Sequence, residues 1–241
     1  MKNILTAFLI LLQRTDIQNN FLSGKFRSTY AKFNILSTLV ILANSFRHKK
    51  IFQLYYESIK KESELICNLV TDNFKKRTKI IILDIGCGIA GYHSNFLNLK
   101  SKSTYLYLMD NSEFNLKALR YGFGASNRYY NSLHLAKNFL SKNNCSSGNS
   151  IFLIETKKDF PHMLPIKIDL VVSFISWGFH YPLEEYWEAI LNRINYESII
   201  VLDVRRGTSS FNFLYSQNNC KIDLIESYDK YDRVKITGVR N

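Results

Sequence analysis

The chain has 241 residues, of which 46% are apolar, with 15 Tyr and 17 Phe but only 3 Pro. This composition excludes a disordered or low-complexity protein and suffices for one sizeable core with a small attached lobe. The net charge of +12 admits an anionic partner, but solvated lysines are the favoured explanation because the basic residues form short clusters and no long tract. The Cys and His residues are dispersed, without C-x-x-C or H-E-x-x-H spacing, so we expect no disulfide framework, no metal and a reducing, cytoplasmic setting.

Residues 1–76 contain no convincing strand and are expected to form a helical N-terminal lobe, followed by a second domain at 77–241. The opening "MKNILTAFLILLQRTD" has the basic start and apolar core of a signal peptide, but no small-residue cleavage site follows. The apolar run at 34–46 is too short to span a bilayer. We expect these segments to be helices packed in the fold or in a homodimer. Contact with a membrane surface, through the apolar and basic segments, and a targeting segment are the alternatives.

From residue 79 onward, short apolar runs alternate with helix-like stretches. Such runs are typical of strands buried on both faces, and their alternation with helices predicts a parallel sheet. Only a short turn separates the last two runs, which predicts an antiparallel hairpin at the end. The sequence therefore predicts an α/β, Rossmann-like, seven-stranded mixed sheet. The expected strands are 79–84, 104–110, 150–155, 167–174, 198–204, 221–228 and 232–239, and the expected helices are 90–100, 113–120, 129–142, 183–194 and 209–217.

A glycine loop follows the first expected strand: "LDIGCGIAG" places Gly86, Gly88 and Gly91 in a G-x-G-x-x-G pattern. Such a loop lets the backbone approach a ligand closely and directs the next helix N-terminus toward it. Asp110 ends the second strand, as the ribose-binding acid does in an NAD-binding domain. Asp84 argues against NAD, because the position two before the first glycine is usually apolar in dinucleotide folds. The alternative is that both acids only cap helices.

The acid–x–Gly–x–Gly of "LDIGCG" resembles the first motif of class I S-adenosylmethionine-dependent methyltransferases. The resemblance covers about two thirds of the chain and includes the acid after the second strand, "IDLVVS" in the fourth strand and the closing hairpin. It implies S-adenosylmethionine (SAM) as cofactor, with Asp84 on its ammonium side and Asp110 on its ribose hydroxyls. It also implies that Glu155 and Thr156 contact adenine, a role for which Asp159 competes. The cofactor-binding residues implied are Asp84, Gly86, Cys87, Gly88, Gly91, Asp110, Asn111, Glu155 and Ser173.

The loop after the fourth expected strand reads "SFISWGFHYP". In a doubly wound sheet, ligands bind beyond the carboxyl ends of the strands, where the strand order reverses, so this loop is expected to face the transferred methyl group. A hydroxyl acceptor must lose its proton, and His180 is the candidate base, with Tyr181 as the second choice. A histidine that only stiffens the loop is the alternative. Trp177 and Phe179 are expected to pack or to stack on the acceptor.

The strings "SWGFHYP", "LDIGCGIAG" and "VLDVRRGT" are also similar to bacterial proteins described as sugar O-methyltransferases. This resemblance implies a saccharide or another small molecule as acceptor. Arg205 and Arg206 would then bind a carboxylate or phosphate through bidentate hydrogen bonds, or would simply be solvated. The loop after the fourth expected strand has no carboxylate before Glu184 and Glu185, which are expected to be helical, so Mg²⁺ is not expected.

The sequence therefore predicts a SAM-dependent methyltransferase that O-methylates a sugar or another small hydroxylated acceptor by direct displacement, with a loop histidine as base. One alternative is an RNA methyltransferase, which the net charge of +12 and the many aromatic residues favour. Against it, the loop lacks the Asn/Asp-Pro-Pro-Tyr/Phe signature of base amino-methylation. The other alternative is a non-catalytic SAM-binding protein.

Overall fold

A computed structural model describes residues 48–93, 97, 103–111, 132–142 and 149–239. These residues form two compact units, each with most of its contacts within itself. The first unit holds residues 48–72, 88–93 and 132–142, and the second holds the remaining described residues, including the whole sheet. Of the predicted lobe at 1–76, residues 1–47 lie outside the described residues, so the predicted domain boundary stays a prediction. None of the helices in the described ranges is long and apolar enough to cross a bilayer.

The first unit is built around helix α5 (His48–Asn73). Its buried apolar residues recur at helical spacing, so that one face of the helix is apolar. The Gly91 N–H donates a hydrogen bond of 3.1 Å to Tyr55 Oη on this face. A Cβ atom at Gly91 would lie 2.3 Å from that oxygen, so only glycine permits this approach. Helix α7 (Leu133–Lys142) buries Leu133, Ala136 and Leu140.

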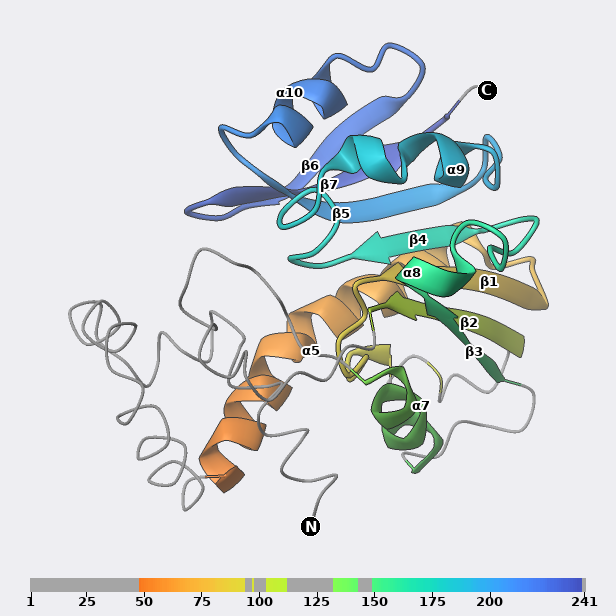
Figure 1. Ribbon diagram of the computed structural model, residues 1–241, viewed down its shortest axis with the longest axis vertical. Helices are drawn as coiled ribbons and strands as arrows, with labels where there is room; N and C mark the ends of the chain where they lie inside the picture. The colour runs from red at the N-terminus through yellow and green to blue at the C-terminus, as the bar shows by residue number, and fades with distance from the viewer. Residues whose placement is uncertain (1–47, 94–96, 98–102, 112–131, 143–148, 240–241) are drawn as a thin grey trace. The chain divides into compact units, whose positions relative to one another are not determined.

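The second unit is a seven-stranded sheet in the order β3-β2-β1-β4-β5-β7-β6 (Figure 1). The strands β1 to β5 are parallel, and β7 pairs antiparallel with both β5 and β6. Because β2 lies on one side of β1 and β4 on the other, the order reverses at the carboxyl ends of β1 and β4. The strands are β1 (Lys79–Ile85), β2 (Ser103–Asp110), β3 (Ser150–Glu155), β4 (Leu170–Ser173), β5 (Ile199–Arg205), β6 (Lys221–Ser227) and β7 (Tyr231–Thr237).

The central strands β1, β4 and β5 are buried on both faces, as their continuous apolar runs predict. The outer strand β6 differs: its pairing with β7 shifts register between Leu224 and Glu226, and Leu224 and Ile225 are exposed. The predicted mixed sheet with its closing hairpin is therefore confirmed. The short helical elements are α8 (Thr156–Asp159), the 3₁₀ turn η2 (Leu183–Glu185), α9 (Trp187–Leu191) and α10 (Ser209–Tyr215).

Several predicted bounds differ from the structure. The helix predicted at 183–194 is interrupted at Tyr186 (φ −115°), which separates η2 from α9. The strand predicted at 167–174 is only β4, because the side chain of Asp169 binds the Ile81 amide before the strand begins. Helix α8 was not predicted, and the helix predicted at 113–120 lies outside the described residues, as do most of 90–100 and the first residues of 129–142.

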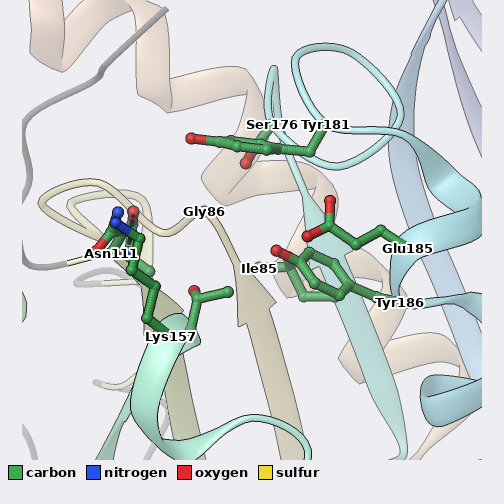
Figure 2. A pocket seen from close by; sticks show the side chains of 10 residues that line it. Ile85, Gly86, Asn111, Lys157, Ser176, Tyr181, Glu185 and Tyr186 are labelled. Carbon is green, nitrogen blue, oxygen red and sulfur yellow. Dashed lines mark hydrogen bonds between the residues drawn. The ribbon is translucent and has the colours of Figure 1, made fainter.

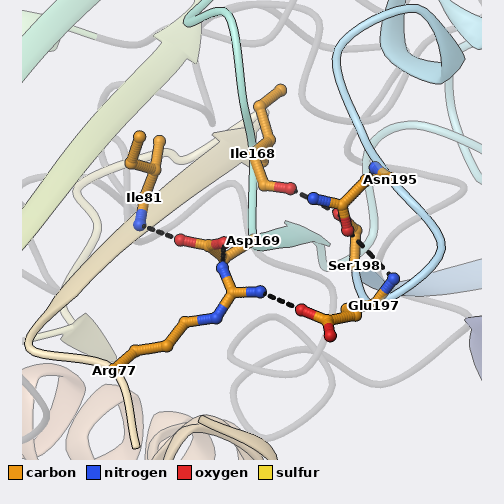
Figure 3. Close-up of polar contacts among 7 residues, drawn as sticks. All are labelled: Arg77, Ile81, Ile168, Asp169, Asn195, Glu197 and Ser198. Atoms are coloured by element: carbon orange, nitrogen blue, oxygen red, sulfur yellow. Dashed lines mark hydrogen bonds and ion pairs between the residues drawn. The ribbon is translucent and has the colours of Figure 1, made fainter.

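An ion-pair cluster ties the amino ends of three strands together (Figure 3). The Asp169 carboxylate accepts the Ile81 N–H at 2.8 Å and pairs with Arg77, whose guanidinium also reaches Glu197 at 2.5 Å. Next to Glu197, Ser198 Oγ donates to the Ile168 carbonyl at 2.6 Å. We call Arg77, Asp169 and Glu197 the edge cluster. It lies at the edge of the sheet opposite to the carboxyl ends of the strands, so it supports the fold and not the site.

Candidate functional site

The glycine turn begins where β1 ends. Gly86 has φ +73°, and its N–H donates to the Met109 carbonyl at 2.8 Å. A Cβ atom at Gly86 would lie 1.9 Å from Ser176 Oγ and 2.2 Å from Ser176 Cβ. Cys87 is buried and its N–H also donates to Met109, at 3.3 Å. Glycine is therefore required at position 86 both for its backbone conformation and for the space above it.

The two later glycines of the motif belong to the first unit. Gly88 has φ +57° with open space where a Cβ would be. Gly91 is explained by its contact with Tyr55 of helix α5, as described above. The roles predicted for Cys87, Gly88 and Gly91 at the cofactor remain predictions.

A pocket of about 140 Å³ lies at the carboxyl ends of β1, β2 and β3 and beneath the loop that follows β4 (Figure 2). Since one water needs roughly 10–15 Å³ on this measure, the pocket has room for part of a ligand. It lies where the strand order reverses, as predicted for a doubly wound sheet. Its described lining residues are Ile85, Gly86, Asp110, Asn111, Thr156, Lys157, Ser176, Tyr181, Glu185 and Tyr186.

The lining is rich in oxygen atoms, and it contains two carboxylates, Asp110 and Glu185, but one lysine among the described residues, Lys157. Burial and the neighbouring Glu185 carboxylate, which also accepts the Tyr186 hydroxyl, raise the pKa of Tyr186. That hydroxyl therefore remains a protonated donor at neutral pH. The balance of charge at the pocket wall favours a ligand with a positive group.

Two residues at the end of β2, Asp110 and Asn111, carry side-chain oxygen atoms that can accept hydrogen bonds. Asp110 Oδ1 accepts the Asn111 N–H at 2.7 Å. Asn111 Oδ1 is buried, lies in a residue of the lining, and has no hydrogen-bond partner within the described part of the chain. A buried acceptor of this kind normally finds a donor, so the atom fits a ligand N–H or O–H.

Of the residues at the end of β3 that were predicted to contact adenine, the structure places only one in the described lining of the pocket. Thr156 lines the pocket, whereas Glu155 is not among the described lining residues. The Glu155 carboxylate forms an ion pair with Lys158 at 3.2 Å. The backbone N–H of Glu155 donates a hydrogen bond to Asp159 Oδ2 at 2.8 Å. Asp159 therefore closes the turn between β3 and α8 instead of facing the pocket.

Asp84 and Ser173 lie within the sheet, just before the pocket, and both are fully buried. Asp84 pairs in register with Leu108 of β2 and Val172 of β4. Ser173 Oγ donates to the Ile85 carbonyl at 2.8 Å and accepts the Trp177 N–H at 2.9 Å. Ser173 thus fixes the end of β1 to the loop after β4, and neither residue is in the described lining.

The loop after β4 folds around the Ser176 carbonyl, which accepts the N–H groups of Phe179, His180 and Tyr181 at 3.1, 2.7 and 3.1 Å. Ser176 and Tyr181 reach the pocket (Figure 2). Trp177 is fully buried in the core, and its Nε1–H donates to the Leu183 carbonyl at 3.0 Å. The structure therefore explains Trp177 by packing, which was one of its two predicted roles.

Phe179 and His180 lie beside β5 and the β6–β7 hairpin. The Phe179 ring contacts the rings of His180 and Tyr231, with centroids 4.7 and 5.4 Å apart, and the Arg205 guanidinium lies 5.6 Å from its centroid. Burial, and secondly the positive charge of Arg205, lower the pKa of His180 to about 4. His180 is therefore neutral at pH 7, and it is not among the described lining residues.

Arg206 binds the hairpin instead of reaching toward a ligand. Its guanidinium donates to Ser227 Oγ at 2.7 Å, to Asp232 Oδ1 at 2.9 Å and to the carbonyls of Tyr228 and Asp229. These contacts occupy the planar guanidinium of Arg206 within the protein, although both arginines are exposed residues. The role predicted for Arg205 at a ligand stays a prediction.

Sequence reasoning missed five of the described lining residues: Ile85, Lys157, Ser176, Glu185 and Tyr186. Ile85 ends β1, and Lys157 and Ser176 lie within three residues of the ends of β3 and β4, so their positions near strand ends were a usable signal. Glu185 and Tyr186 were hidden by the predicted helix at 183–194, because the break at Tyr186 that turns both side chains toward the pocket has no Gly or Pro. In the described ranges no three His, Cys, Asp or Glu side chains gather as metal ligands.

No family model and no curated protein matches the sequence. Among solved structures, the CMeT domain of the citrinin polyketide synthase is 12% identical, with a TM-score of 0.53, over 84% of this chain and 60% of that one. A Listeria monocytogenes protein assigned to the class I SAM-dependent methyltransferases is 14% identical, with a TM-score of 0.49, over 99% and 88%. The O-methyltransferase TomG of Streptomyces achromogenes, in complex with SAM, is 10% identical, with a TM-score of 0.48, over 75% and 80%.

At such identities a structural likeness concerns the fold alone, and among these three only the CMeT domain exceeds a TM-score of 0.5. The strand order and the antiparallel position of β7 agree with that likeness. The described sheet therefore has the Rossmann-like fold of this CMeT domain.

Proposed function

We propose that the protein is a SAM-dependent methyltransferase acting on a small hydroxylated acceptor such as a sugar. The observation that carries the proposal is the pocket itself, whose lining includes both Gly86 of the glycine turn and Asp110 at the end of β2. The sequence resemblance gave these two residues a common ligand, and the fold brings both to one cavity. The fold of the sheet supports the same function.

The lining residues fit this cofactor. Asp110 is a carboxylate at the position where ribose hydroxyls need acceptors, and Asn111 Oδ1 is a buried acceptor without a partner in the described ranges. The carboxylates of Asp110 and Glu185 favour a positively charged ligand over an anionic one. When bound, SAM supplies a methyl group on a sulfonium, which is transferred by direct displacement.

The protein must align the acceptor, exclude water and receive a proton from a hydroxyl. The two predicted candidates are His180 and, in its deprotonated phenolate form only, Tyr181. His180 is neutral at pH 7, which is the form that accepts a proton, although a pKa of about 4 makes it a weak base. Tyr181 lines the pocket and is 37% exposed. Comparing the turnover of His180→Gln and Tyr181→Phe at saturating SAM distinguishes the two candidates.

Calorimetry with SAM, S-adenosylhomocysteine and NAD⁺ tests the cofactor. We expect the first two to bind and NAD⁺ not to bind. Asp110→Asn should weaken SAM binding by about tenfold or more, because a hydrogen bond to a charged group contributes about 1.5–3 kcal/mol. The control is Asp229→Asn, which changes an exposed acid on the β6–β7 turn. Tight NAD⁺ binding, or SAM affinity that ignores Asp110, would refute the proposal.

A nucleic-acid acceptor is the second candidate, favoured by the net charge of +12. Phosphate contacts give affinities that fall steeply as salt rises. An RNA gel shift with a steep salt dependence, together with methyl transfer to that RNA, would favour this candidate over a small molecule.

A further inference from the structure

The loop that carries Ser176 and Tyr181 into the pocket contains an unusual backbone conformation at Ile175, with φ +55°. A β-branched residue is an outlier in this left-handed region, because its side chain crowds the backbone. Such a conformation persists only where the surrounding structure holds it, and it is often found at functional sites. The question is what holds Ile175.

A buried ion pair lies next to Ile175. Asp203 of β5 is 0% exposed and Arg233 of β7 is 3% exposed. Arg233 binds Asp203 with two parallel hydrogen bonds, Nε to Oδ1 at 2.7 Å and Nη2 to Oδ2 at 2.9 Å. Bidentate geometry fixes the orientation of both side chains, so the pair forms a rigid support between two antiparallel strands.

This pair contacts two consecutive loop residues. Asp203 Oδ2 accepts the Ile175 N–H at 3.2 Å. The Arg233 guanidinium lies 4.3 Å from the centroid of the Phe174 ring, in cation–π contact. The carboxylate therefore fixes the amide of Ile175 while the guanidinium fixes the preceding side chain.

The next residue transmits this support to the pocket. Ser176 lies over Gly86, so closely that a Cβ at Gly86 would overlap it, and its carbonyl accepts three amides of the loop, including that of Tyr181. Both Ser176 and Tyr181 line the pocket. A change at Ile175 would therefore move the wall that faces Gly86.

We propose that Asp203 and Arg233 are positioning residues that hold Ile175 in its left-handed conformation and thereby set the pocket wall at Ser176 and Tyr181. As a statement about cofactor binding, this rests on the proposed function. As a statement about the loop, it stands without any ligand. Neither residue is among the described lining residues of the pocket, so we expect both to act through the loop.

The test removes both charges together, because a single substitution would leave a buried charge unpaired and endanger folding. In Asp203→Leu/Arg233→Met, we expect hydrogen exchange of the amides at 175–181 to accelerate about tenfold or more while the amides of β1 and β4 keep their protection. SAM affinity should fall about tenfold, the order expected when a strained conformation is no longer held. The matched control is Arg77→Met/Asp169→Asn, which removes an ion pair of the same sheet at its opposite edge.

Adding Ile175→Gly separates positioning from general stability, because glycine adopts φ +55° without strain. The triple variant should recover most of the lost SAM affinity, although its unfolding midpoint need not recover. The proposal is wrong if the double variant keeps loop protection, or if the triple variant recovers no affinity. If the wild-type protein binds no SAM, the proposed function fails, and the exchange measurement alone still decides whether the ion pair holds the loop.

Discussion

At Gly86 the chain combines a positive φ with the side chain of Ser176 directly over its α-carbon. Gly86→Ala should destabilise the protein by about 2–5 kcal/mol, since left-handed strain of about 1–2 kcal/mol adds to overpacking of about 1–3 kcal/mol. Urea unfolding measures this change. Weakened SAM binding is expected with it, because the displaced Ser176 lines the pocket.

Gly207 provides the matched control for Gly86. It has nearly the same φ, +72°, but nothing lies within 4 Å of its would-be Cβ. Gly207→Ala therefore carries the backbone strain without the overlap and should cost about 1 kcal/mol. Equal losses in the two variants would show that the contact with Ser176 is unimportant.

His180 predicts a pH dependence of stability. Its pKa is lowered to about 4 in the folded state, against an ordinary value of 6.5. Between pH 4 and pH 6.5 the His180 side chain binds a proton in the unfolded chain but not in the folded chain. The contribution of His180 to the free energy of unfolding is therefore complete above pH 6.5 and is lost as the pH falls toward 4. The loss is on the order of 3 kcal/mol.

Urea midpoints at pH 7 and pH 4.5 check this prediction. Wild type should lose more stability between the two pH values than His180→Gln, which cannot titrate there. A parallel loss in both proteins would contradict the buried, neutral state of His180. The same comparison bears on its candidacy as the base, because a histidine that titrated near neutrality would be a better proton acceptor.

At the scale of elements, the edge cluster joins the amino ends of β1, β4 and β5. Arg77→Met should destabilise the protein by about 2 kcal/mol, because it leaves the Asp169 carboxylate, whose side chain is 8% exposed, without its cation. Burial raises the pKa of Asp169 and the Arg77 charge lowers it, so Arg77→Met should raise this pKa further, and the loss of stability should be largest at neutral pH and shrink as the pH falls. Thermal and urea unfolding at pH 7 measure the stability change.

The cluster contains its own control. The Glu197 side chain is 73% exposed, and such a surface pair contributes about 0–1 kcal/mol. Glu197→Gln should therefore change stability far less than Arg77→Met. If the two changes are equal, the burial of Asp169 does not decide the strength of the cluster.

For the molecule as a whole, the sequence predicted the sheet well and the pocket in part. Buried parallel strands have apolar runs that leave little choice, so β1, β2, β3 and β5 were located to within a residue at each end. Gly86 and Asp110 were found because Gly86 follows β1 directly and Asp110 is the last residue of β2. Glu185 and Tyr186 were not, because their orientation depends on a helix break that tertiary contacts impose, such as the Ser210 Oγ bond to the Leu183 N–H.

The same limit explains the arginines of "VLDVRRGT". Local sequence could not tell that the guanidinium of Arg206 would be used by a hairpin more than twenty residues away in the chain. Nor could it show that Asp203 and Arg233, thirty residues apart, would meet in the core. Both pairings depend on β7 lying between β5 and β6, a long-range arrangement that side-chain pattern alone does not encode.

The register shift in β6 has a consequence for how copies of the protein meet in solution. A straight border strand offers a ladder onto which a neighbouring chain can add, the first step of fibre growth. In β6 the regular backbone pairing with β7 is interrupted between Leu224 and Glu226. The charged side chains of Lys221 and Asp223 lie on the same strand, close to this interruption. This border of the sheet therefore resists polymerisation, even though it exposes two aliphatic residues.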